Sequence, residues 1–270
     1  MELRYYLYPP AYERRLSGDI ENNLKELNKV LTEHSDRFDT FCYDCSLFDV
    51  ITASGKALVD VIFSGMSDVQ FQRTIVPKLF NKLKLIQCHL TNMASMNEVF
   101  KNSINALWGI LFEEEQLHNI NSVDKYLKFK DNVIRKALNE DNFRDLKSLL
   151  FKKIVFTDKA IGQITTVGDK IFKQIVDRLI DLEAYGRNWN EGGFSIKAVN
   201  DRTALNISDE SDTVKHNERL RQERYFTLPN SIGGKYCYLH IKTGMFRFHF
   251  YPDENEHVIY IAYVGPHLPL

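Results

Sequence analysis

The stretch that decides the predicted fold runs from Cys237 to Leu268 and reads CYLHIK-TG-MFRFHFYPDENEH-VIYIAYVGPHL. Three runs in it alternate between apolar and polar residues, and turn residues separate them. Alternation with a period of two is typical of half-buried antiparallel strands. Thr243-Gly244 fits a two-residue hairpin turn, because glycine tolerates the positive φ that such turns need. We therefore predict an antiparallel meander at this end of the chain.

A turn at Thr243-Gly244 predicts that His240 lies opposite Arg247 and that Tyr238 lies opposite His249. Opposed residues share one face of a sheet, so each face has its own composition. The apolar face collects Cys237, Leu239, Ile241, Phe246, Phe248 and Phe250. The other face collects Tyr238, His240, Lys242, Arg247 and His249. Solvated strand faces more often mix Thr, Ser, Lys and Glu, so this concentration of imidazoles and cations marks a candidate site.

Composition places the chain among ordinary soluble proteins. The 270 residues are 44% hydrophobic and 26% charged, and the formal net charge is −1. This balance excludes a global basic field of the kind that attracts nucleic acid, although it leaves room for a local basic patch. Four cysteines without a dense framework indicate a reducing compartment. The N-terminus lacks the apolar core of a signal peptide and no window is long enough to span a membrane, so we expect a cytoplasmic protein.

The first two thirds of the chain read as helical. Residues 1–16 are aromatic and contain Pro9-Pro10, which suggests an extended arm. Apolar residues then recur at helical spacing, or form long apolar runs with few glycines. The helices expected on this basis cover 17–31, 47–63, 68–90, 95–118, 122–138, 142–156 and 165–185.

The composition changes at Gly186–Gly193, where we place a domain boundary. Residues 1–186 are predicted to form a helical bundle that acts as a sensor, a cover or an oligomerisation unit. Residues 187–270 are predicted to form a small domain with strands in 194–207, a short helix near 213–221, a strand at 224–228 and the meander. The predicted fold class is α+β, with a large α-helical N-terminal domain followed by a small antiparallel-sheet domain.

The cysteines offer a zinc site as an alternative use of the N-terminal domain. Cys42 and Cys45 have the C-x-x-C spacing of structural zinc ligands, and Cys88-His89 would complete four. Two adjacent ligands on one helix are awkward to direct at one ion, so we favour buried thiols. Ser54-Gly55-Lys56 resembles the end of a phosphate-binding loop, but Val50 stands where the required glycine should be.

Four interpretations of the polar sheet face remain open. Imidazoles and cations together suit acid–base chemistry on a phosphodiester, because His carries protons near neutral pH and Arg and Lys stabilise phosphate charge. His240, His249 and His267 would suit a metal, but no carboxylate on that face completes a familiar set unless Asp253 approaches. The face would equally serve as a binding surface without chemistry, or pack inside the protein. We favour the first interpretation and expect no metal and no cofactor.

The C-terminal domain resembles toxins of the RelE/HigB type. The order of the short helix, the strand at 224–228 and the strands CYLHIK, MFRFHFY and VIYIAYV is similar to that family's order, and the family's last strands carry a comparable arginine. The resemblance implies metal-independent RNA cleavage, in which a ribose 2′-hydroxyl attacks its own phosphate. It also implies that Lys242, Arg247, His249 and His267 hold the matching positions. The family has no counterpart of residues 1–186 and is strongly basic, in contrast to this domain.

These observations predict an endoribonuclease toxin or phage-defence effector, similar to an mRNA interferase. His240 or His249 would be the general acid or base, with His267 as a second proton carrier and Lys242 and Arg247 as phosphate clamps. Four further residues are predicted to bind the substrate: Tyr238 and Tyr260 by stacking a base, and Arg221 and Arg224 by contacting phosphate. Expected partners are single-stranded RNA, also on the ribosome, an antitoxin or partner subunit, and a second copy of the chain. The alternative is a non-enzymatic interaction subunit of a defence or regulatory complex.

Overall fold

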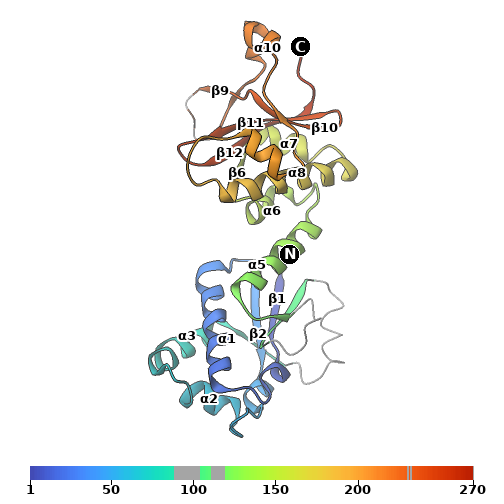
Figure 1. The fold of residues 1–270 in the computed structure, drawn as a ribbon. Coiled ribbons are helices and arrows are strands. Elements are labelled where there is room, and N and C mark those ends of the chain that lie inside the picture. Colours follow the sequence, from blue (N-terminus) through green and yellow to red (C-terminus); the bar gives the residue numbers. More distant parts are fainter. Residues whose placement is uncertain (88–103, 111–118, 230, 232, 270) are drawn as a thin grey trace. The chain divides into compact units, whose positions relative to one another are not determined.

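The computed structural model describes residues 1–87, 104–110, 119–229, 231 and 233–269 (Figure 1). The chain divides into two compact units, which we call unit 1 (Met1–Val133) and unit 2 (Ile134–Leu270). Each unit has its own sheet and its own helices. Within the described residues, no helix is long and apolar enough to cross a membrane.

Unit 1 is built on a five-stranded parallel sheet with the strand order β3-β2-β1-β4-β5. Its strands are β1 (Leu3–Leu7), β2 (Asp39–Asp44), β3 (Lys84–Ile86), β4 (Asn105–Trp108) and β5 (Asn119–Ile120). The central strands β1 and β4 are almost entirely buried. Burial of both faces is typical of parallel sheets and explains why these strands are apolar without alternating.

Helices connect these strands. The described elements are η1 (Pro9–Tyr12), α1 (Ser17–Lys29), η2 (Val30–His34), η3 (Cys45–Asp49), α2 (Leu58–Ser64), η4 (Phe71–Ile75), α3 (Val76–Lys82) and α5 (Val123–Ala137). Of these, η1 and η3 are short 3₁₀ segments, and η2 and η4 are π segments. Helix α1 buries Ile20, Leu24 and Leu27 on one stripe and runs alongside the strands (Figure 1). The unit boundary falls inside α5.

The predicted all-helical N-terminal domain is therefore wrong. Residues 1–16 are not an extended arm, because Leu3–Leu7 forms the central strand β1. The helix predicted for 47–63 is present only in its last part, as the α-helix α2, which begins at Leu58 and ends at Ser64. The helix predicted for 95–118 lies largely outside the described residues, and Asn105–Trp108 inside it forms β4. Buried parallel strands and buried helices share continuous apolar runs, so hydrophobic periodicity does not separate them.

Unit 2 contains a second five-stranded sheet with the strand order β6-β12-β11-β10-β7. Its strands are β6 (Ile154–Phe156), β7 (Ile207–Ser208), β10 (Leu239–Thr243), β11 (Phe246–Asp253) and β12 (Val258–Pro266). Strand β6 is parallel to β12, and the remaining pairs are antiparallel. The predicted meander is thus confirmed as β10-β11-β12, and it belongs to a sheet with a parallel edge strand.

The hairpin register differs from the predicted one. Thr243 pairs with Phe246, so the two loop residues are Gly244 and Met245, and Gly244 supplies the positive φ of 55°. His240 consequently lies opposite His249, and Lys242 lies opposite Arg247. Moving the turn by one residue changes each partner by two positions, which keeps the paired side chains of β10 and β11 on the faces predicted for them. Cys237 and Tyr238 precede β10 and have no partner in this pairing.

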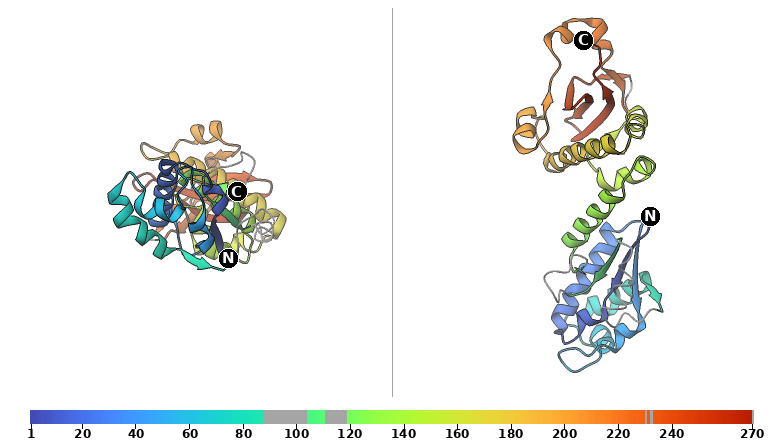
Figure 2. Two further views of the ribbon diagram at one scale, coloured as in Figure 1. Left: turned by 90° about the horizontal axis from the view of Figure 1, so that it is seen from below. Right: turned by 90° about the vertical axis from the view of Figure 1, so that its right-hand side faces the viewer.

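Helices lie on both sides of this sheet. The described helices of unit 2 are α6 (Phe143–Leu150), α7 (Asp158–Ile164), α8 (Asp169–Asn188), α9 (Ile196–Arg202), α10 (Asp212–His216) and α11 (Glu218–Gln222). Helices α7 and α8 lie on one side, with α7 against β12 and α8 against β6. Helix α10 lies on the other side, together with the short hairpin of β8 (Tyr225–Thr227) and β9 (Gly234–Tyr236) (Figures 1 and 2).

Two further predictions for unit 2 are corrected. The strands expected in 194–207 are replaced by α9, whose first turn is capped by the Ser195 side chain, and only Ile207–Ser208 is a strand. The helix expected over 142–156 ends at Leu150, and Ile154–Phe156 forms β6. Strand β8 lies within the strand expected at 224–228.

Candidate functional site

The hairpin of β10 and β11 places four polar side chains on one face of the sheet. We call His240, Lys242, Arg247 and His249 the polar face. Register pairing sets the two imidazoles opposite each other, with ring centroids 5.3 Å apart. It also sets Lys242 opposite Arg247, two residues nearer the turn on each strand. The polar face therefore has a histidine half and a cationic half.

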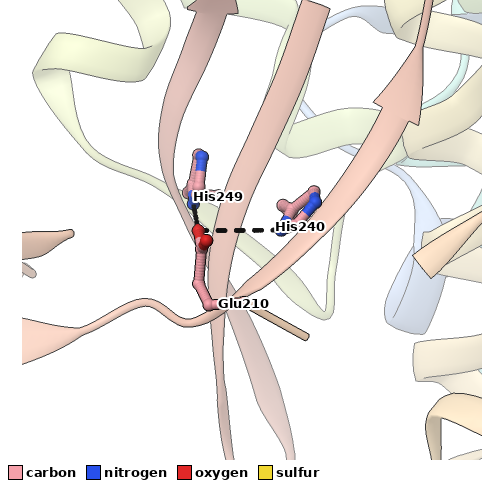
Figure 3. A group of neighbouring side chains, drawn as sticks. All are labelled: Glu210, His240 and His249. Atoms are coloured by element: carbon pink, nitrogen blue, oxygen red, sulfur yellow. Dashed lines mark ion pairs between the residues drawn. The ribbon is translucent and has the colours of Figure 1, made fainter. Parts of the chain in front are cut away.

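A carboxylate that the sequence did not reveal completes the histidine half. Glu210 follows β7, which pairs with β10 through Ser208 and His240. Its Oε1 lies 3.6 Å from Nδ1 of His249 and 3.8 Å from Nδ1 of His240 (Figure 3). The exposed fractions are 6% for Glu210, 6% for His240 and 2% for His249. We call these three residues the Glu-His-His cluster.

Arg224, which lies between α11 and β8, contacts this cluster. Its side chain is fully buried, and its Nε donates to Glu210 Oε1 at 3.1 Å while Nη1 donates to Leu220 O at 2.9 Å. Its Nη2 is buried and has no hydrogen-bond partner in the part of the chain that the structure describes. Arg224, predicted to bind phosphate, thus faces Glu210 and not solvent.

The two buried imidazoles are neutral near pH 7. Burial lowers the pKa of His240 to about 4, and the charges of Lys242 and Arg247 add to this effect. Burial lowers the pKa of His249 to about 3, with a further contribution from His240. The positive charge of Arg224 lowers both pKa values further. His240 Nε2 lies 3.1 Å from Ser208 Oγ, and His249 Nδ1 lies 3.3 Å from Cys237 O.

The cationic half of the face reaches solvent. Lys242 is exposed and Arg247 is half-buried. Arg247 Nη1 donates to the carbonyls of Gly244 and Phe246, which holds the guanidinium beside the hairpin turn. His267 is exposed just after β12, and its charge is among those that lower the pKa of His240. We call Lys242, Arg247 and His267 the rim cations.

A row of tyrosines follows the short β8–β9 hairpin. Tyr225 and Tyr236 are register partners with stacked rings 5.4 Å apart, and the ring of Tyr238 lies 5.7 Å from that of Tyr236. Tyr225 is 40% exposed, and the other two are half-buried. We call Tyr225, Tyr236 and Tyr238 the tyrosine row. Tyr238 was predicted as a stacking residue, whereas Tyr225 and Tyr236 were missed.

The inner side of β8 covers the sheet next to the histidines. Phe226 stacks on Tyr263 with ring centroids 6.0 Å apart, and Tyr263 is the register partner of His249 on β12. Leu228 joins the same apolar cluster, and Tyr260 packs against it from β12. We call α10 and the β8–β9 hairpin the cover of the sheet; on this side of the sheet, His240 and His249 are 6% and 2% exposed.

The other predicted residues lie apart from the cluster or outside the described chain. Arg221 is half-buried on α11, and within the described ranges its Nε has no hydrogen-bond partner. Cys42 is buried in β2 and Cys45 is exposed at its end, while Cys88 and His89 lie outside the described residues. The short helix predicted near 213–221 is present as the two helices α10 and α11, and the Ser211 side chain caps α10. Glu210 was missed because its approach to His240 depends on the pairing of β7 with β10.

Comparisons with models of known protein families, with curated proteins and with solved structures found no match.

Proposed function

We propose that this protein is an endoribonuclease that binds single-stranded RNA across the rim cations and the tyrosine row of unit 2. The observation that carries the proposal is the pairing of Lys242 with Arg247 at the solvent-facing end of the polar face. A chain with a net charge of −1 gathers positive charge there. The proposed biological role is that of a toxin or phage-defence effector.

The two surfaces suit the two parts of a nucleotide. Lys and Arg attract a phosphate, and an arginine fixed by its own backbone contacts presents its remaining N–H groups in a defined direction. Stacked tyrosines with an exposed edge offer a base a flat apolar partner, which is how proteins hold unpaired bases. Lys235 lies over the ring of Tyr251, and Lys215 lies near Tyr236 but is ion-paired with Asp209.

The proposed chemistry is attack of a ribose 2′-hydroxyl on the adjacent phosphate, with departure of the 5′-oxygen. One group accepts the 2′-hydroxyl proton, another gives a proton to the leaving oxygen, and cations stabilise the charge on phosphorus oxygens. His267 is the exposed imidazole for proton transfer, and Arg247 and Lys242 stabilise the phosphate. His240 and His249 are neutral and buried, so they take part in proton transfer only after the cover opens.

Cleavage of a fluorescent single-stranded RNA by the purified chain, with and without EDTA, tests this proposal. We expect fragments with 2′,3′-cyclic phosphate ends in both conditions. Arg247→Ala and His267→Ala should each lower the rate at least ~100-fold, as expected when a transition-state contact or a proton carrier is lost. Arg219→Ala removes an exposed cation from α11 and is the matched control. Wild-type rates in both test variants would refute the assignment.

Burial of the histidines and of Arg224 favours a second candidate, a non-enzymatic interaction subunit whose cluster only stabilises unit 2. Growth after induced expression separates the two functions. A ribonuclease toxin should stop growth in its wild-type form and not as Arg247→Ala. Equal growth with both forms, together with no cleavage in vitro, would favour the interaction subunit.

A further inference from the structure

The Glu-His-His cluster gathers three metal-ligating groups in the interior of unit 2. Each residue offers one ligand atom, and the three atoms all lie within 4.8 Å of one another. The cluster takes one ligand from the loop after β7 and one each from β10 and β11. We propose that it binds one divalent transition-metal ion, and that Zn²⁺ is the ion it suits best.

The distances are close to those of a filled site. Bonds of 2.0–2.2 Å from zinc to nitrogen and oxygen place tetrahedral ligand atoms about 3.4 Å apart. Glu210 Oε1 lies 3.6 Å and 3.8 Å from the two Nδ1 atoms. Movements of a few tenths of an ångström therefore bring Glu210 Oε1 to the separation of a filled site from each Nδ1 atom, and the two imidazoles, whose ligand atoms lie within 4.8 Å of each other, must also approach. His249 Nδ1 also lies 3.3 Å from Cys237 O, so it must release its hydrogen bond to that carbonyl when it binds an ion.

His240 is oriented as a metal ligand would be. Its Nδ1 is buried, has no hydrogen-bond partner among the described residues, and faces Glu210 at a separation too long for a hydrogen bond. Its Nε2 lies 3.1 Å from Ser208 Oγ, which accepts the Nε2 proton when Nδ1 carries the lone pair. A ligating histidine usually donates its other N–H in this way, which fixes the ring and its tautomer. An ion would satisfy the one atom of this ring that the protein leaves unpaired.

The chemistry of the three ligands matches zinc more closely than calcium or magnesium. Two imidazoles and one carboxylate form the ligand set of several zinc enzymes, and the same set holds non-haem iron. Calcium and magnesium prefer sites made of oxygen ligands. Arg224 orients the carboxylate and also adds a positive charge, so a cluster with a dication favours an anionic fourth ligand such as hydroxide.

A bound ion would connect the cover to the sheet, because Glu210 precedes α10 whereas both histidines belong to the central hairpin. This inference does not depend on the proposed ribonuclease activity. It is tested by metal content and spectra, so its failure and the failure of RNA cleavage can be told apart.

The test is zinc binding to the full chain after removal of metals with a chelator. We expect one Zn²⁺ per chain in competition with a chromophoric chelator. Glu210→Gln and His249→Asn should each weaken binding at least 100-fold. Ser208→Ala keeps all three ligands and should weaken binding 10- to 100-fold, as the loss of an outer hydrogen bond does. The controls Cys45→Ser and His216→Asn change exposed residues outside the cluster and should leave affinity unchanged.

Cobalt substitution reports the ligand type directly. A site of two imidazoles and a carboxylate gives visible d–d bands without a thiolate charge-transfer band, and Ser208→Ala should shift these bands. Failure of the folded wild-type chain to compete for zinc would overturn the proposal. A thiolate band that disappears in Cys45→Ser would overturn it as well, because the ion would then be held by the cysteines of unit 1. If Glu210→Gln or His249→Asn does not fold, the affinity and the spectrum of Ser208→Ala decide.

Discussion

Replacing Arg224 with Met should destabilise unit 2 strongly, because the buried Glu210 carboxylate would lose the guanidinium that donates a hydrogen bond to it. Arg224 is fully buried, and its Nε lies 3.1 Å from Glu210 Oε1. At that separation the attraction between unit charges is about 5 kcal/mol for an effective dielectric constant of about 20. Removal of one partner of a buried pair leaves the other charge uncompensated and costs about 3–5 kcal/mol. We expect Arg224→Met to fall in this range.

The double variant Arg224→Met/Glu210→Leu should be less destabilised than Arg224→Met alone. It removes both charges, and residues in contact commonly show coupling energies of about 0.5–3 kcal/mol. Arg135→Met is the matched control, because its ion pair with Asp177 is solvent-exposed and should contribute less than about 1 kcal/mol.

Hydrogen exchange under increasing denaturant, read by mass spectrometry on metal-free protein, measures this effect unit by unit. Peptides from β10, β11 and β12 report on unit 2, and peptides from α1 and β2 serve as an internal reference in unit 1. A loss below about 1 kcal/mol in Arg224→Met, similar to that in Arg135→Met, would refute the assignment of Arg224 to a buried structural ion pair.

Three further substitutions test other contacts. Glu183 accepts the backbone N–H groups of Lys152, Lys153 and Ile154 at the start of β6, so Glu183→Gln should lower the unfolding free energy of unit 2 by about 2 kcal/mol in urea denaturation. Lys130 donates to Asp36 and to the buried Asp39, so Lys130→Met should cost unit 1 about 3 kcal/mol and leave exchange in unit 2 unchanged. Burial raises the pKa of Glu21, but hydrogen bonds from Lys25 and Ser67 outweigh it and lower the pKa to about 2. The contribution of the Glu21 carboxylate to the unfolding free energy of unit 1 is therefore fully present above about pH 4.5 and disappears as the pH falls towards 2. Glu21→Gln should destabilise unit 1 at pH 7 and have little effect near pH 2, as followed by circular dichroism.

The C-terminal hairpin was predictable because its information is local. Alternation between polar and apolar residues in β10 and β11 sets the faces, and the faces survive a turn placed one residue away from its true position. Lys242, Arg247, His240 and His249 therefore share one face as expected. What the pattern lacked was the exact partner of each residue, which depends on whether Gly244 is the first or the second residue of the loop.

Unit 1 was not predictable in the same way. Its central strand carries LRYYL, which is nearly all buried, and a strand buried on both faces has no period of two. Strand β1 is also hydrogen-bonded to β2 and to β4, which lies about a hundred positions later in the sequence. Such pairing is not encoded in any short window of sequence. The helical spacing of the neighbouring segments therefore predicts helices at positions where the chain forms strands.

The Glu-His-His cluster shows the same limit at the level of a site. His240 and His249 were found from their strands, but the carboxylate needed for a ligand set was sought on the same face, with Asp253 as the nearest choice. Glu210 comes from a loop that β7 brings to the edge of β10, and its sequence context indicated only a helix cap. The burial of His240 and His249, which makes both imidazoles neutral, depends on the elements that pack over this face and is not encoded in the two strands.

The most direct test of RNA binding by the rim cations is the salt dependence of binding. Affinity for a fluorescent single-stranded RNA should be measured at several salt concentrations for the wild-type chain and for Lys242→Ala/Arg247→Ala. Each phosphate contact on a single strand contributes about 0.7 to the slope of log K against log salt concentration. We predict weaker binding by the double variant and a slope that is smaller by about 1.4, the value for two such contacts. Equal affinities with equal slopes would show that RNA does not bind this face.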